Sequence, residues 1–201
     1  MTSLAVLTMT SPLLFASGAP AVEESEGITY KENLETPKVP SKAVNAITRH
    51  LDKLAAAFKK AGFETARMRN NEILKVYVPC DTIFAPNSTV ARPEASAILS
   101  HFKPLLARPE SYKLLMVAYT DDSGDTTYSE RFTEARSMAV DSVFEEITGT
   151  ENPNAHPYFM GKNAPRTNNK SIKNRRLNRR VEVIIVPDKK LIEDASGKRL
   201  N

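Results

Sequence analysis

The sequence predicts an α+β fold, in the form of an α/β two-layer sandwich in which helices and strands alternate. Residues 73–80 alternate apolar and polar side chains, as in a half-buried strand. Residues 113–119 form a nearly continuous apolar run, as in a central strand buried on both faces. Residues 180–187 form a third apolar segment, and segments with helical periodicity precede the strands. This βαβαβ-type order, with an extra N-terminal helix, favours helices packed on one sheet.

The N-terminal region is expected to precede the folded domain. Residues 4–16 are apolar but too few to span a bilayer, and small residues follow them. This pattern indicates a signal-like segment over residues 1–21, with a plain apolar tail as the alternative. Residues 22–42 are polar and contain Pro37 and Pro40, so we expect a linker there.

An N-terminal helix is expected within residues 43–66. Apolar side chains recur there at helical spacing, and Gly62 suits the position after a helix C-terminus. The residues predicted to face a core are Val44, Ile47, Leu51, Leu54, Ala55 and Phe58.

The main domain is predicted over residues 67–188. Its second helix begins at Pro93 and is kinked or shortened at Pro104. The third helix is expected from about 127 to 147, after a turn rich in hydrogen-bond acceptors. Its predicted core stripe contains Phe132, Ala135, Ala139, Val140, Val143 and Ile147. A long loop rich in Asn and Pro leads to the last strand, and residues 189–201 form a C-terminal tail.

The composition excludes several classes of protein. With 41% hydrophobic and 26% charged residues, the chain is neither fully disordered nor a polytopic membrane protein. One Cys excludes an intramolecular disulfide framework and a Cys-based zinc cage, and three scattered His argue against a His metal cluster. No nucleophile-elbow, P-loop, zincin or dinucleotide-binding motif is present. The protein is therefore predicted not to be an enzyme, with no catalytic residue, metal or cofactor.

Positive charge is concentrated in residues 166–180. This segment holds seven basic residues and no acidic one, whereas the rest of the chain is mildly acidic. Such a segment is a solvated surface, an anion site or a nucleic-acid patch. Only Tyr158 and Phe159 lie nearby as rings on which bases could stack, which disfavours nucleic acid.

Asp121 and Arg136 are the main candidates for a binding site. Asp121 lies in the turn after the 113–119 strand, and Arg136 lies on or beside the apolar face of the third helix. A guanidinium there requires a partner, because burying an unpaired charge is costly. Asp121 is the natural candidate. Either the two form an internal ion pair, or they hold the ammonium and carboxylate of a zwitterionic ligand.

Four sequence motifs occur in a specific order. They are a loop with Phe84 at residues 83–88, T-D-D-S-G at 120–124, S-E-R-F-T-E-A-R at 129–136 and N-R-R-V at 178–181. Together they resemble the OmpA-like C-terminal domain of the OmpA, Pal and MotB type, a peptidoglycan-binding family.

The resemblance implies a ligand and a set of site residues. The ligand is the diaminopimelate of the peptidoglycan stem peptide, bound non-covalently, with Asp121 holding its ammonium and Arg136 its carboxylate. The further ligand-binding residues that it implies are Asn87, Thr120 and Phe132, and the supporting residues are Asn178, Arg179 and Arg175.

The expected protein is therefore a periplasmic module of a Gram-negative bacterium that tethers the envelope to the cell wall. Its expected partners are peptidoglycan and outer-membrane or periplasmic proteins, with no nucleic acid and no transmembrane span. Two alternatives remain open. One is a module of the same fold that binds a protein or another envelope partner, and the other is nucleic-acid binding through residues 166–180.

Overall fold

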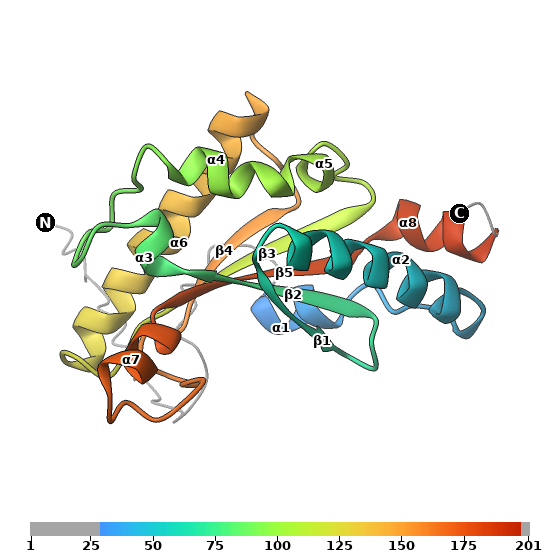
Figure 1. Cartoon of the computed structure of the whole chain (residues 1–201). Coiled ribbons are helices and arrows are strands. Elements are labelled where there is room, and N and C mark those ends of the chain that lie inside the picture. The colour runs from blue at the N-terminus through green and yellow to red at the C-terminus, as the bar shows by residue number, and fades with distance from the viewer. Residues whose placement is uncertain (1–28, 198–201) are drawn as a thin grey trace, which may run out of the picture.

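The computed structural model describes residues 29–197 (Figure 1), so the signal-like segment predicted over residues 1–21 lies outside the described residues. Within this part of the chain, five strands form one sheet in the order β1-β2-β5-β3-β4. The β3–β4 pair is parallel and the other pairs are antiparallel. The strands are β1 Glu64–Met68, β2 Ile73–Pro79, β3 Tyr112–Tyr119, β4 Ala155–Phe159 and β5 Arg180–Pro187.

The helices of the described residues differ widely in length. The short helices are α1 Tyr30–Glu35, α3 Cys80–Ile83, α4 Ala95–Leu99, α5 Lys103–Leu106, α7 Ile172–Asn178 and α8 Lys189–Ser196. The two long helices are α2 Ser41–Lys60 and α6 Thr126–Thr148. A 3₁₀ turn, Ser100–Phe102, joins α4 to α5, so the helix is interrupted next to Pro104 as predicted.

The prediction of an α+β fold is confirmed, and the three predicted strands correspond to β2, β3 and β5. Sequence analysis missed β1 and β4, which are the two edge strands. The β1 sequence, ETARM, lacks apolar alternation, and β4 contains Pro157. Proline has no N–H for a sheet ladder, so it is tolerated at an edge but is a poor strand signal in sequence.

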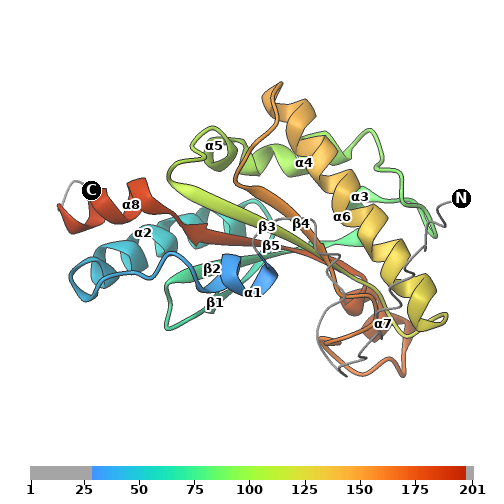
Figure 2. The ribbon, with the colours of Figure 1, turned by 180° about the vertical axis from the view of Figure 1, so that it is seen from behind.

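The sheet has two apolar faces. One face presents alternate residues of β2, β3 and β5, such as Val76, Met116 and Val183, to a core shared with α2, α4, α5, α6 and α8. The opposite face includes Leu115, Val117 and Ile184 and is covered by Tyr30 and Leu34 of α1. Viewed from behind, α1 lies over the sheet (Figure 2).

Part of the predicted linker is therefore folded as α1. The hydroxyl of Thr29 accepts a hydrogen bond from the Glu32 amide and the Glu32 side chain accepts from the Thr29 amide, which forms a capping box. The buried Asn33 donates from Nδ2 to the Tyr158 hydroxyl at 2.7 Å. The mixed polar and apolar sequence of this segment contains too few turns for its helical period to be recognised.

The N-terminal helix expected within residues 43–66 begins two residues earlier than predicted and ends before Gly62. It begins at Ser41 and ends at Lys60, and Gly62, with φ of 92°, turns the chain into β1. The predicted C-terminal tail contains α8, whose Leu191 and Ile192 are buried in the same core as α2. Both helices are therefore parts of the domain rather than appendages.

The buried stripe of α6 differs from the predicted one. Val140 and Val143 are buried as expected, but Phe132, Ala135, Ala139 and Ile147 are only half-buried. The N-terminal half of α6 instead buries Ser129, Thr133, Arg136 and Ser137.

Hydrogen bonds within α6 explain this polar burial. The Thr133 hydroxyl donates to the Ser129 carbonyl at 2.8 Å and accepts from the Gly161 amide at 3.0 Å. A Cβ on Gly161 would lie 3.2 Å from Ser129 Oγ, so the backbone at this position packs closely on the helix. Small, internally satisfied hydroxyls allow this close approach, and apolar periodicity does not detect them.

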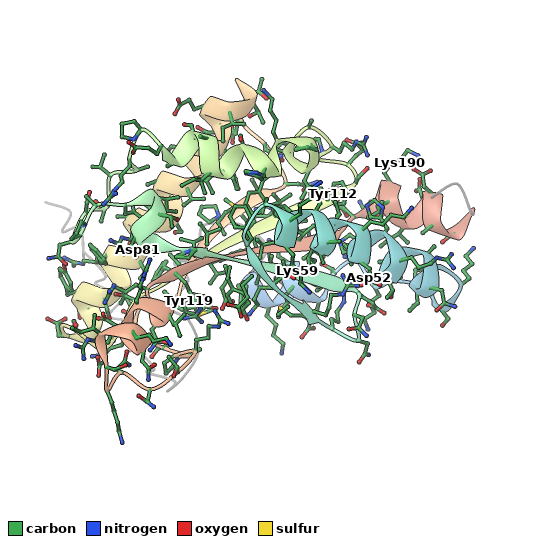
Figure 3. All side chains as sticks on the ribbon, in the orientation of Figure 1. Asp52, Lys59, Asp81, Tyr112, Tyr119 and Lys190 are labelled. Carbon is green, nitrogen blue, oxygen red and sulfur yellow. The ribbon has the colours of Figure 1, made fainter. Side chains whose placement is uncertain are left out.

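One end of the sheet collects the ends of several elements. Asp81 comes shortly after β2, and Tyr119 is the last residue of β3. Both lie toward α7, whereas Tyr112 and Lys190 lie toward α8 (Figure 3). The end of β3, the start of β5, α3 and α7 therefore meet at the same end of the molecule (Figure 1). Loops at strand ends are common positions for binding residues.

Candidate functional site

Asp121 follows β3 directly and is held in a fixed orientation. It is only 4% exposed. Its Oδ1 accepts a hydrogen bond from the Ser123 amide at 3.0 Å, and its Oδ2 accepts from Arg179 Nη1 at 2.5 Å. Burial by itself raises the pKa of Asp121, but the hydrogen bonds from Ser123 and Arg179 outweigh it and hold the pKa below its usual value. The carboxylate therefore stays ionised at neutral pH.

Arg136 is a buried cation with an open hydrogen-bond donor. The residue is 3% exposed, and its Nε donates to the Ser88 carbonyl at 2.9 Å. The guanidinium carbon lies 4.1 Å from the Phe132 ring centroid and 4.8 Å from the Phe84 ring centroid. Its Nη1 is buried and has no hydrogen-bond partner among residues 29–197. A buried donor without a partner is costly. Such donors are typical of binding sites, where a ligand can accept the hydrogen bond.

The two rings keep the guanidinium in place without satisfying its donors. Cation–π contacts attract the charge to the ring faces, so the edges of the guanidinium plane remain available for hydrogen bonds. Burial lowers the pKa of Arg136, and the nearby positive charge of Arg179 lowers it further. Arginine nevertheless remains protonated at any physiological pH.

Asp121 and Arg136 do not form the internal ion pair that was one of the two sequence-based interpretations. No ion pair joins them within the described residues, because Arg179 occupies the Asp121 carboxylate. Arg179 also acts electrostatically on Arg136, so its charge links the two candidate residues. The site has two cations and one carboxylate, and this excess of positive charge suits a ligand that carries a carboxylate.

The other predicted ligand-binding residues have different surroundings. Phe132 packs directly on Arg136. Asn87 is exposed, with φ of 56°, in the loop whose next residue supplies the carbonyl that holds Arg136. Thr120 is buried beside Asp121, and its amide donates to the Gly161 carbonyl at 2.8 Å.

The three supporting residues that the resemblance implies, in and just before N-R-R-V, have two different roles. Asn178 is buried and orders the loop before α7: its Oδ1 accepts from the Arg166 and Thr167 amides at 2.8 and 3.0 Å. Arg179 binds Asp121 directly. Arg175 donates to the Asn169 carbonyl at 2.9 Å, so it braces the same loop.

Sequence reasoning missed the rest of the Arg136 environment. Phe84 and Ser88 belong to the predicted loop motif, but nothing in the sequence connects Ser88 to Arg136, 48 positions further along the chain. The fold brings them together through α3 and the bridge between Phe84 and Ala91. Cys80, predicted to be a small core residue, is buried there, and burial raises its pKa to about 11.

The basic segment 166–180 carries less free charge than its sequence indicates. Four of its seven basic residues are in ion pairs with acidic residues from elsewhere in the fold. These pairs are Arg166–Glu64, Arg176–Asp81, Arg179–Asp121 and Arg180–Glu182. Much of the charge of this segment is therefore neutralised within the fold, which disfavours an electrostatic nucleic-acid surface.

An open hollow of about 460 Å³ adjoins the site at the first turns of α6. It is lined by Asp125, Thr127, Tyr128, Arg131 and Phe132. Phe132 is shared between this hollow and the Arg136 environment. The hollow therefore borders the charged site at Phe132.

Among residues 29–197, no group of three or more His, Cys, Asp or Glu side chains is placed to hold a metal ion. Among the described helices, none combines the length and apolarity that a bilayer span requires.

The fold and the site define a small α+β domain that buries a carboxylate, Asp121, and a guanidinium, Arg136, at the positions that the motifs indicated. Residues 83–179 match the OmpA family. The four motifs that predicted the family lie within this match or at its border. The OmpA family is a family of peptidoglycan-binding domains, which agrees with the expectation of a non-catalytic module.

A relative and three solved structures are similar to this chain. The outer-membrane lipoprotein YfiB of Pseudomonas aeruginosa is 26% identical over 130 residues, which cover 65% of this chain and 74% of YfiB. A MotB-like protein from Desulfovibrio vulgaris superposes with a TM-score of 0.63 at 22% identity, covering 73% of this chain and 97% of that structure.

The other two structures share the fold at similar coverage. One is the cell wall anchor of the T6SS from P. aeruginosa, with a TM-score of 0.57, 22% identity, and coverage of 69% and 97% of the two chains. The other is the periplasmic domain of Helicobacter pylori MotB, with a TM-score of 0.55, 18% identity, and coverage of 72% and 93%. At these identities the structures support the fold.

Proposed function

We propose that this protein binds peptidoglycan non-covalently and recognises the diaminopimelate of the stem peptide. One observation carries the proposal: Arg136 is a buried guanidinium with an open Nη1, and Arg179, whose charge acts on Arg136, holds the Asp121 carboxylate. A buried guanidinium with no carboxylate partner among the described residues is difficult to explain as a structural feature, because a neutral side chain of similar size would be less costly. A ligand carboxylate is the group that satisfies it.

Diaminopimelate matches this arrangement because its side chain ends in both an ammonium and a carboxylate. The carboxylate would accept hydrogen bonds from Arg136, between the rings of Phe84 and Phe132. The ammonium would donate to Asp121, which shares its negative charge with Arg179. Each charge-assisted hydrogen bond contributes about 1.5–3 kcal/mol, so the affinity of one site would be modest.

This proposal includes a place in the cell. The relatives support a periplasmic location, since one is named as an outer-membrane lipoprotein and another structure is a periplasmic domain. A domain at that location would tether the envelope to the wall, together with outer-membrane or periplasmic partners. Many copies on one sacculus would raise the overall strength of attachment through avidity.

Co-sedimentation with purified, insoluble peptidoglycan sacculi tests the proposal. The wild-type protein is expected in the pellet, and Arg136→Ala and Asp121→Ala are expected in the supernatant while they remain folded by circular dichroism. Met138→Ala provides a matched control, because Met138 lies on α6 but is 58% exposed. It should sediment like the wild type. A wild-type protein that stays in the supernatant at low salt would rule out wall binding and favour a protein partner for the same fold.

A further inference from the structure

We propose that Tyr128 forms a second subsite, which binds a sugar ring of the peptidoglycan glycan strand. This inference rests on the proposed function, because it extends the same ligand from its peptide to its saccharide. Nothing in the comparisons or the motifs assigns a role to Tyr128. Its geometry, its neighbours and the chemistry of the hollow beside it carry the argument.

The Tyr128 ring is held in one orientation although the side chain is 52% exposed. It stacks on Phe132 with a centroid distance of 5.5 Å and an interplanar angle of 16°. Gly124, with φ of 88°, packs against it so closely that a Cβ at this position would lie 2.9 Å from Tyr128 Cδ1. A large aromatic ring that is rigid and exposed loses little entropy when it binds, so it is suited to recognition.

The hollow beside the ring has a mixed polar and apolar lining. Tyr128 and Phe132 supply apolar surface, and Asp125, Thr127 and Arg131 supply hydrogen-bonding groups around it. A pyranose ring has the complementary character: one face presents C–H groups, and the periphery presents hydroxyl and acetamide groups. An apolar partner would leave the surrounding polar groups without partners, which is unfavourable. The lining therefore fits an N-acetylated amino sugar better than an apolar peptide or a lipid chain.

The hollow is also connected to the charged site through one side chain. Phe132 stacks on Tyr128 on one side and lies 4.1 Å from the Arg136 guanidinium carbon on another. Stem peptide and glycan are covalently joined in the cell wall, so a polymer held at Arg136 brings sugar rings into its neighbourhood. The Tyr128–Phe132–Arg136 stack thus offers adjacent positions for the two chemical parts of one polymer.

Binding measurements with three soluble probes test this inference. The probes are the stem tripeptide L-Ala-γ-D-Glu-meso-diaminopimelate, the disaccharide N-acetylglucosamine–N-acetylmuramic acid without peptide, and the disaccharide tripeptide. In the wild type, we expect the disaccharide to increase the affinity of the tripeptide about fivefold, the size of one aromatic stacking contact. Tyr128→Ala should remove this increase, so that the disaccharide tripeptide binds no more tightly than the tripeptide to the same variant. Tyr128→Phe, which keeps the ring, should retain most of the increase.

The three probes separate the failure of this inference from the failure of the proposed function. If the tripeptide binds and the disaccharide adds nothing, or if Tyr128→Ala keeps the increase, the sugar subsite is disproved and peptide recognition stands. If the tripeptide does not bind but the free disaccharide shifts the Tyr128 ring resonances in NMR spectra, diaminopimelate recognition is disproved and the sugar subsite stands. Met138→Ala is the control on α6 and should behave as the wild type with every probe.

Discussion

At the scale of single residues, the site combines a satisfied anion with an unsatisfied cation. Asp121 has two hydrogen-bond donors in place, whereas Arg136 has one carbonyl for Nε and none for Nη1 among the described residues. Function and stability therefore oppose each other at Arg136. A buried charge that serves to bind a ligand lowers the stability of the ligand-free protein, compared with a neutral side chain at the same position.

Replacing Arg136 by Met should separate these two effects. Arg136→Met removes the unpartnered donor and keeps an unbranched side chain between Phe84 and Phe132, so the free energy of unfolding should be unchanged or about 1 kcal/mol higher. Binding to sacculi should be lost. Urea unfolding and co-sedimentation on the same sample check both parts. A destabilisation of about 3 kcal/mol or more would show that the guanidinium contributes to the fold instead.

The Asp121 carboxylate should contribute to stability in a pH-dependent manner. Its folded-state pKa lies below the usual 3.8, so its stabilising effect is present above that value and is lost as the pH falls through the lower folded-state pKa. Asp121→Asn should therefore be less stable than the wild type at neutral pH, and the difference should shrink below about pH 4. Thermal unfolding of both proteins across this range measures it. A difference that grows on acidification would contradict the assigned direction.

Sequence alone identified the two charges but not their partners. Asp121 follows a clear strand and Arg136 follows a recognisable helix period, so both are visible as local anomalies. The Asp121–Arg179 contact joins residues 58 positions apart, and its formation depends on how β3 and β5 pair. Such contacts depend on tertiary approach, which periodicity does not encode.

At the scale of elements, the prediction succeeds where a segment is long or fully buried and fails where it is short, polar or at an edge. The strands β2, β3 and β5 and the helices α2 and α6 follow from apolar periodicity. The edge strands β1 and β4 each pair with one neighbouring strand instead of two, and α1 has less than two turns. These elements are stabilised mainly by contacts with the surface that they cover, which their own sequences do not reveal.

The α1 helix should stabilise the domain through that covered surface. The double variant Tyr30→Ala/Leu34→Ala exposes the second apolar face of the sheet, and we expect it to lower the free energy of unfolding by about 1–3 kcal/mol. Lys31→Ala, on the exposed side of the same helix, should have little effect. Urea unfolding compares the two, and binding of a hydrophobic dye reports the uncovered face. Equal stabilities would mean that α1 is dispensable for the domain.

At the scale of the whole molecule, α2 and α8 share one core with the family domain although they lie outside residues 83–179. Leu51 of α2, Leu191 of α8 and Val183 of β5 belong to the same apolar cluster. The domain that folds is therefore larger than the segment that the family match defines.

Unfolding should accordingly be a single transition. Leu191→Ala leaves a cavity in the shared core and should lower the free energy of unfolding by about 2–4 kcal/mol. The loss should be the same when unfolding is followed by circular dichroism and by amide exchange of β3, which lies next to the site. A variant in which α8 is released while β3 keeps its protection would show two units instead of one.

The position of β5 has a mechanical consequence. This strand runs from Arg180, beside the site, to Pro187, just before α8, and it is bonded along its length to β2 on one side and β3 on the other. Under the proposed function, a load applied between a wall polymer at the site and the α8 end of β5 would be directed along this strand. The hydrogen bonds on both sides of β5 would then be sheared together rather than opened one after another, so the central strand is placed where it resists tension best.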